Sequence, residues 1–212
     1  MSPAEHPDRL DHEKLRSALS GLTIGNHVVV LEETTSTNDV VAQLAPARTE
    51  GLVVFAERQT AGRGQYGRRW ESLAHNGLWL SVLLRPRISV AESSKLTDLL
   101  AQTIAVTVAQ VTGAAASIKQ PNDVLLGGRK IAGVLVEMRV EANGGYCAIA
   151  GMGVNVNHGI DDFADELRAT AGSIAMFVGR PVDRHAFAIA LLRQLDAAYR
   201  EFSESSATRA TS

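Results

Sequence analysis

The segment 59–70 constrains the fold more than any other part of this sequence, because it joins two predicted strands without a helix. It holds three glycines, three arginines and one tryptophan, and it has no acidic residue. The flanking runs 52–58 and 78–84 are rich in aliphatic residues and predict strands. The Gly-x-Gly-x-x-Gly spacing would indicate a dinucleotide-binding fold only if a helix began at the glycines. Polar residues lead directly to the second strand instead, so the sequence excludes that fold.

The same loop has the composition of an anion-binding element. Glycines let the backbone approach a ligand closely and present successive N–H groups. Arginine side chains are forked donors that match phosphate and carboxylate oxygens, and Trp70 can stack on a planar base. A solvated surface loop is the alternative, but an ordered loop from about Gln59 to Asn76 is uncommon without a function. We therefore predict an anion site here, in a chain of formal net charge −2.

The composition predicts one cytoplasmic domain. The 212 residues are 45% hydrophobic, which is enough to bury one core. Cys147 is the single cysteine, so no disulfide framework is expected and a reducing compartment suits the chain. The polar residues 1–14 do not resemble a secretory signal, and no apolar run approaches the roughly 20 residues of a membrane span. The six histidines lack zinc-site spacing, so we expect no structural metal.

The order of strand and helix patterns predicts an α+β domain with a mixed, largely antiparallel β-sheet backed by helices. Closely spaced strands with a hairpin signal at Asn143-Gly144 favour antiparallel pairing. The domain is expected to span 1–202, followed by a disordered Ser/Thr/Ala tail at 203–212. Strands are expected at 27–32, 52–58, 78–84, 117–119, 124–126, 130–140 and 146–157, and helices at 11–19, 39–44, 89–113 and 183–202.

Four further clusters carry polar or glycine residues next to predicted strands and helices. Taken singly, most have structural explanations: a helix cap, an ordinary turn, or glycines at a bulge. Lys130 is less easily explained, because a lysine at the start of a hydrophobic strand can place its ammonium against a phosphate or carboxylate. Packing of its aliphatic stem is equally consistent with the pattern. The clusters are Ser36-Thr37-Asn38, Lys119-x-Pro-Asn122-Asp123, Gly128-x-Lys130-x-x-Gly133 and Gly151-x-Gly-x-Asn155.

In their order along the chain, together with the loop Gln59-x-x-Gly62-Arg63-Gly64-x-x-Gly-Arg68-x-Trp70, the clusters closely resemble the catalytic domain of biotin protein ligases. The resemblance covers 34–157 by motif, and the final helix extends it to about 202. It implies a mixed sheet backed by helices on one face, similar to the core of class II aminoacyl-tRNA synthetases. It also implies an ATP-dependent ligase that forms biotinyl-5′-AMP and transfers biotin to a lysine of a biotin carboxyl carrier domain.

The resemblance implies roles for individual residues. Lys130 and Arg63 would be catalytic, because they can offset the charge that accumulates when a carboxylate attacks a triphosphate. ATP and Mg²⁺ are expected as co-substrates and biotin as the substrate, with no permanently bound cofactor, and Asp123 would be the magnesium-associated carboxylate. The implied biotin site comprises Ser36, Thr37, Asn38, Gln59, Gly62, Arg63, Gly64, Gln65, Lys130, Gly133 and Gly151. The implied ATP site comprises Arg63, Arg68, Trp70, Lys119, Asn122, Asp123, Lys130 and Asn155.

The sequence departs from the family pattern in several ways. Gln65 stands where the family usually has arginine, so we hypothesise weaker retention of the adenylate, and Gln120 replaces a tryptophan. We expect neither an N-terminal winged helix nor a C-terminal β-barrel domain. We also expect no nucleic-acid partner and no membrane partner. The expected partner is a biotin carboxyl carrier protein or domain of a carboxylase. The sequence does not identify that carboxylase, and it leaves homodimerisation open.

Three other functions remain as alternatives at this point. A lipoate or octanoate protein ligase or transferase shares the fold, but its arginine-rich motif ending in three consecutive glycines is absent. A nucleic-acid-binding module could use the arginine loop, although a sequence pI of about 6.3 disfavours it. A non-enzymatic paralogue is kept open by Gln65 and Gln120. The resemblance favours the biotin ligase.

Overall fold

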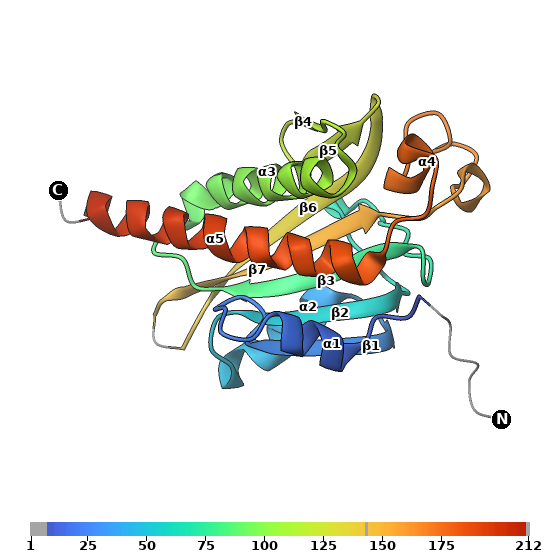
Figure 1. Cartoon of the computed structure of the whole chain (residues 1–212). Helices are drawn as coiled ribbons and strands as arrows, with labels where there is room; N and C mark the ends of the chain where they lie inside the picture. Colours follow the sequence, from blue (N-terminus) through green and yellow to red (C-terminus); the bar gives the residue numbers. More distant parts are fainter. Residues whose placement is uncertain (1–7, 143, 211–212) are drawn as a thin grey trace.

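Seven strands form one mixed sheet in the computed structural model, which describes residues 8–142 and 144–210 (Figure 1). Their order across the sheet is β1-β2-β3-β7-β6-β5-β4. β1 and β2 run parallel, and the other neighbouring pairs in this sheet run antiparallel, as the sequence predicted. The strands are His27–Thr34 (β1), Leu52–Gln59 (β2), Gly77–Leu84 (β3), Ser117–Lys119 (β4), Asp123–Leu126 (β5), Arg129–Val140 (β6) and Tyr146–Asn155 (β7).

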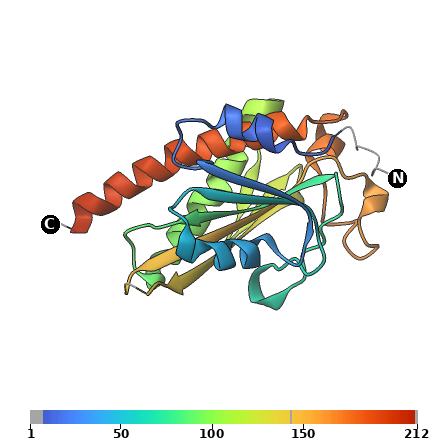
Figure 2. The ribbon, with the colours of Figure 1, turned by 90° about the horizontal axis from the view of Figure 1, so that it is seen from below.

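Helices cover both faces of the sheet, which differs from the expected single face (Figure 2). The cause is the burial of β2 on both sides, since successive side chains of a strand point to opposite faces. Val53 and Phe55 belong to the main core with residues of α1, α3 and α5, whereas Leu52 and Val54 pack with Val41 of α2. The helices are His12–Ala18 (α1), Thr37–Leu44 (α2), Ser93–Thr112 (α3), Ile174–Val178 (α4) and Arg184–Ala210 (α5).

Local sequence signals set the ends of the long helix α3. Ser89 and Glu92 form the predicted capping box, which closes the 3₁₀ turn Val90–Glu92 from which α3 continues. Gly113 ends the helix with φ +74°, a left-handed conformation that favours glycine. At the predicted hairpin between β6 and β7, Asn143 lies outside the described residues, and Gly144 has φ +81°.

The C-terminal helix α5 is longer than predicted. Asp183 caps its start as expected, because its Oδ1 accepts a hydrogen bond from the backbone N of Ala186 at 3.0 Å. The helix continues to Ala210, so the prediction of a disordered tail is wrong for residues 203–210, and 211–212 lie outside the described part. Neither glycine nor proline occurs in 203–210, and Phe202 packs against the core, so nothing stops the helix where the composition changes. The short helix α4 was not predicted.

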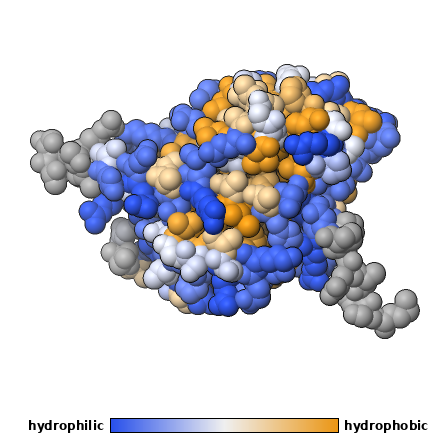
Figure 3. Space-filling view, in the orientation of Figure 1, coloured by the Kyte–Doolittle hydropathy of each residue, from blue (hydrophilic) through white to orange (hydrophobic). Residues whose placement is uncertain are grey.

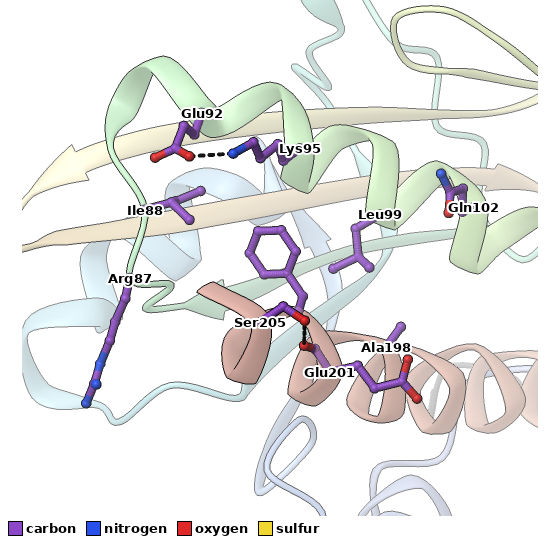
Figure 4. Close-up of a pocket in the computed structure, with 10 residues that line it drawn as sticks. Arg87, Ile88, Glu92, Lys95, Leu99, Gln102, Ala198, Glu201 and Ser205 are labelled. Atoms are coloured by element: carbon purple, nitrogen blue, oxygen red, sulfur yellow. Dashed lines mark hydrogen bonds and ion pairs between the residues drawn. The ribbon is translucent and has the colours of Figure 1, made fainter. Parts of the chain in front are cut away.

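A surface groove of about 550 Å³ lies between α3 and the C-terminal part of α5 (Figure 4). Its charged side chains are partly paired with one another: Lys95 forms an ion pair with Glu92. In the space-filling view of this face, hydrophobic residues extend from the centre toward the upper edge, and hydrophilic residues dominate the left and lower margins (Figure 3). Across 8–142 and 144–210, none of the helices combines the length and apolar composition that crossing a bilayer demands.

A fully buried ion pair connects β2 with the start of α5, and its hydrogen bonds also reach the segment before α1. Arg184 at the start of α5 and Glu57 of β2 are both 0% exposed, with Nη2 and Oε2 2.7 Å apart. Arg184 also donates to the carbonyls of Gly77 at 3.0 Å and Asp8 at 2.7 Å, and Glu57 accepts from the backbone N of Leu10 at 2.7 Å. Each charge is therefore compensated by several partners, which is the condition under which burial of charge is tolerated.

We predict that Arg184→Ala lowers the free energy of unfolding by about 3–5 kcal/mol, because it leaves the buried Glu57 carboxylate without its arginine partner. Urea unfolding followed by circular dichroism measures the change. The matched control is Arg193→Ala on the same helix, whose side chain is exposed and makes one bond to the Ala18 carbonyl; it should cost less than about 1 kcal/mol. Equal losses in the two variants would contradict the importance of the buried pair.

Candidate active site

A cavity of about 650 Å³ brings together the motifs that lie apart in the sequence. It lies on the α2 face of the sheet. Gly151 is two residues from Ile149 along β7 and therefore faces the same side, and Ile149 packs in the cluster that contains Val41 of α2. Gly62 does not line the cavity; its carbonyl accepts a hydrogen bond from the backbone N of Trp70 at 2.9 Å. The predicted site residues that line the cavity are Ser36, Thr37, Asn38, Gln59, Arg63, Gly64, Gln65, Arg68, Trp70, Lys119, Asn122, Asp123, Lys130, Gly133, Gly151 and Asn155.

Glycines of β6 and β7 form a floor on which the Trp70 indole lies. A Cβ added at Gly133 would lie 2.9 Å from the Trp70 ring, and one at Gly153 would lie 2.6 Å from it. Trp70 also meets Trp79 edge to face, with ring centroids 6.2 Å apart. The indole Nε1 is buried and has no hydrogen-bond partner within the described part of the chain. The sequence identified Gly133 and Trp70 separately, but not Gly153, whose position next to Gly151 in the same motif was the available signal.

Lys130 is the second residue of β6, and it lines this cavity. Backbone hydrogen bonds to Thr170 and Gly172, at 2.8 and 2.9 Å, hold its main chain. Its Nζ lies 2.5 Å from Oδ1 of Asp123 and 5.2 Å from the centre of the Trp70 ring. The cation therefore has one carboxylate and one aromatic face as neighbours, and both lie in the same cavity. The sequence did not identify segment 170–172 as a support, because this contact is long-range.

Arg63, the other predicted catalytic cation, is held by two carboxylates that sequence reasoning missed. Its Nη1 and Nη2 donate to the two oxygens of Asp39 at 2.8 and 2.7 Å, and Nη2 lies 3.5 Å from Oε2 of Glu137. The hydrogen bond from Arg63 lowers the pKa of Asp39 and correspondingly raises the pKa of Arg63. Arg63 and Lys130 thus share one cavity, but each cation is paired with its own acidic neighbour in this structure.

The Ser-Thr-Asn cluster at the start of α2 forms a polar wall rather than a simple cap. Ser36 makes no side-chain cap hydrogen bond, and Thr37 and Asn38 are buried. The backbone N of Thr37 donates to Oε1 of Gln59 at 2.9 Å, which ties α2 to the end of β2. A Cβ at Gly151 would lie 2.5 Å from Oδ1 of Asn38, so glycine there makes room for this amide.

The remaining predicted nucleotide contacts hold loops in place. The Asn122 amide donates to the Val134 carbonyl at 2.9 Å, and the Asn155 amide donates to the Gly172 carbonyl at 3.0 Å. Asp123, the predicted magnesium carboxylate, is paired with Lys130. Among the described residues, no three His, Cys, Asp or Glu side chains gather to hold a metal. A single carboxylate is nevertheless enough for a Mg²⁺ ion that arrives on a triphosphate and keeps several waters.

Aromatic packing beside the cavity buries His158. Its ring stacks on Phe163 with centroids 5.3 Å apart and meets Trp79 edge to face at 5.7 Å. Burial lowers its pKa from the ordinary 6.5 to about 4, so the imidazole is neutral at neutral pH. His158 lines the cavity and was also missed, because a lone histidine after a strand carries no motif.

Comparison with known proteins places this geometry in a family. Residues 30–155 match the model of the biotin/lipoate A/B protein ligase family. The chain belongs to this family. Among its relatives, the biotin–[acetyl-CoA-carboxylase] ligase of Mycobacterium tuberculosis is 36% identical over 89% of this chain and 70% of its own length. The bifunctional ligase/repressor BirA of Bacillus subtilis is 34% identical over 92% of this chain, which spans 61% of that relative.

Solved structures of the family share the fold. The biotin protein ligase of Aquifex aeolicus in complex with biotin and ATP has a TM-score of 0.74 and 28% identity, covering 84% of this chain and 72% of that one. A lipoate protein ligase from Thermoplasma acidophilum has a TM-score of 0.59 over 86% of this chain and 91% of its own. With 15% identity, that second likeness shows the fold alone.

We predict that stability falls as the pH drops from about 7.5 to about 5, by about 2 kcal/mol more in the wild type than in His158→Phe. The folded state keeps His158 neutral down to about pH 4, while the unfolded chain takes up a proton below about 6.5, so acid favours unfolding. Phenylalanine preserves the stack, and Nδ1 has no hydrogen-bond partner in the described residues. Urea unfolding at the two pH values checks this. The same pH dependence in both proteins would contradict it.

Proposed function

We propose that this chain is an ATP-dependent biotin protein ligase that forms biotinyl-5′-AMP and then biotinylates a lysine of a carrier domain. The observation that carries the proposal is that one cavity contains both predicted catalytic cations, Arg63 and Lys130, beside the polar wall of α2. The chain's family contains relatives named as biotin–[acetyl-CoA-carboxylase] ligases, and the Aquifex structure holds both biotin and ATP. These relatives support biotin and ATP as the substrates of this chain.

The first half-reaction joins two anions. A carboxylate oxygen of biotin attacks the α-phosphorus of ATP, a new O–P bond forms, and the bond to the bridging oxygen breaks to release pyrophosphate. Lys130 offsets negative charge on the attacked phosphate and on the acyl carboxylate, and Arg63 acts in the same way from the loop. Mg²⁺ enters with ATP as a co-substrate, and Asp123 is the carboxylate beside Lys130 that would face it.

Both cations must exchange their present partners for the ligand. Lys130 and Asp123 are 32% and 24% exposed, and Arg63 and Asp39 are 36% and 35% exposed. Ion pairs with this degree of solvent contact contribute little, about 0–1 kcal/mol, so the exchange is inexpensive. The carboxylates therefore hold the cations in place in the free protein without blocking their use.

The second half-reaction transfers the biotinyl group. The neutral ε-amine of a carrier lysine attacks the acyl carbon, the bond to the phosphate oxygen breaks, and AMP leaves while the new amide loses a proton. The loop 59–76 would exclude water from the reactive anhydride by covering it. Tyr66 of this loop lines the cavity, with φ +60° and a side chain that is 84% exposed. Gln65 lines the cavity without a charge, which is the basis for expecting weaker retention of the adenylate.

We predict that Lys130→Ala lowers biotin-dependent exchange of pyrophosphate into ATP by roughly 100- to 1,000-fold, because the variant loses a preorganised charge at the attacked phosphate. The control is Lys95→Ala, whose ammonium is paired with Glu92 in the groove between α3 and α5 and should leave exchange unchanged. Unaltered exchange in Lys130→Ala would remove Lys130 from the mechanism. A wild-type protein that exchanges pyrophosphate with lipoate but not with biotin would overturn the proposed function.

A further inference from the structure

A continuous line of side-chain hydrogen bonds runs from β6 to the polar wall. The amide nitrogen of Asn38 donates to Oε2 of Glu137 at 2.7 Å. The Ser81 hydroxyl of β3 donates to Oδ1 of Asn38 at 2.5 Å, and Ser81 and Thr37 hydroxyls are 2.7 Å apart. Thr37 and Asn38 line the cavity, whereas Ser81 and Glu137 do not. Ser81 is fully buried, so its polar atom serves only this line of bonds.

The carboxylate at one end fixes the direction of every bond in the line. A carboxylate only accepts, so the NH₂ side of the Asn38 amide faces Glu137 and its oxygen faces Ser81. Ser81 then uses its single proton on Asn38, and Thr37 must be the donor in the contact between the two hydroxyls. The Thr37 proton is thereby committed to Ser81 at 2.7 Å rather than to Gln59 Oε1 at 3.2 Å.

The result is a wall with a defined donor and acceptor pattern. Because its proton is used behind the wall, the Thr37 oxygen is left as an acceptor toward the cavity. Next to it, Oε1 of Gln59 accepts from the backbone N of Thr37, and Nε2 gives one proton to Ser72 at 2.9 Å. The second Nε2 proton of Gln59 is left as a donor. An acceptor beside a donor is the complement of a group that carries an N–H next to a C=O.

We propose that Glu137 and Ser81 are positioning residues that set this polarity and thereby make the pocket select a cyclic urea head over an aliphatic or dithiolane head. The inference rests on the proposed function and deepens it, because the family contains ligases for both biotin and lipoate. A site that hydrogen-bonds an N–H rejects analogues without one, since its own polar groups are then left unpaired. Neither residue touches the ligand in this account, and both act through Asn38 and Thr37.

The test measures KM and kcat of pyrophosphate exchange with biotin and with desthiobiotin, which keeps the urea, and binding of octanoate, which has no N–H. In Ser81→Ala the direction of the Thr37 proton is no longer set, and we expect KM for both urea ligands to rise roughly 10-fold with kcat nearly unchanged. Glu137→Gln lets the Asn38 amide face either way and should give the same rise in KM. Octanoate binding should not weaken in either variant.

We call this line of hydrogen bonds the relay. A double variant tests whether Ser81 and Glu137 act through the relay or independently. Because both residues act on one line of bonds, Ser81→Ala/Glu137→Gln should raise KM no further than either change alone. Controls are Ser117→Ala on β4, and Glu33→Gln on β1, whose glutamate is also paired with an arginine, at 2.7 Å. Urea unfolding confirms that each variant remains folded.

The possible results separate a failure of the relay from a failure of the proposed biotin ligase function. Wild-type exchange with biotin, together with unchanged KM in both variants, would overturn the relay but leave the ligase intact. Additive effects in the double variant, or an equal loss of octanoate binding, would also overturn the relay. If the wild type exchanges pyrophosphate with octanoate or lipoate and not with biotin, both the relay and the biotin ligase are overturned.

Discussion

The lack of a side chain at Gly133, Gly151 and Gly153, on the α2 face of β6 and β7, is the constraint on which the rest of the site depends. These strands pair with neighbours on both edges and are covered by the main core on their other face, and the cavity lies over Gly133, Gly151 and Gly153. A Cβ at any of the three would meet Trp70 or Asn38 at less than 3.0 Å, a separation that real contacts essentially never reach. The cavity, the position of Trp70 and the polar wall therefore follow from the same three glycines.

Electrostatics divides this space into two functional parts. Around Lys130 and Arg63, three carboxylates from α2, β5 and β6 hold the cations at partly exposed positions where a triphosphate can compete for them. Behind the wall, Glu137 instead meets the amide of Asn38, which is buried together with Ser81, so a direction of hydrogen bonding persists there. One carboxylate thus serves both the charged and the neutral part of the site.

Sequence patterns predicted the secondary structure that depends on neighbouring residues. They missed the side-chain contacts between residues that are far apart in the sequence. The strands, the capping box at Ser89 and the end of α3 at Gly113 follow from short-range rules, and the cavity brings together nearly all residues implied by the resemblance. Ser81, Glu137 and Asp39 were not identified, because a serine or carboxylate within an alternating strand or a helix turn looks like any polar residue until its partners are known. The extension of α5 past Phe202 was missed because Ser and Thr suggested disorder, although neither residue type ends a helix.

A crystal structure of the protein with biotin and a non-hydrolysable ATP analogue is the most direct test of this account. The account predicts the ligands above the glycine floor, with Nζ of Lys130 within hydrogen-bond distance of a phosphate or carboxylate oxygen and Trp70 moved from its contact with Gly153. Ligands bound elsewhere, or bound in the cavity while Lys130 remains paired only with Asp123, would contradict it.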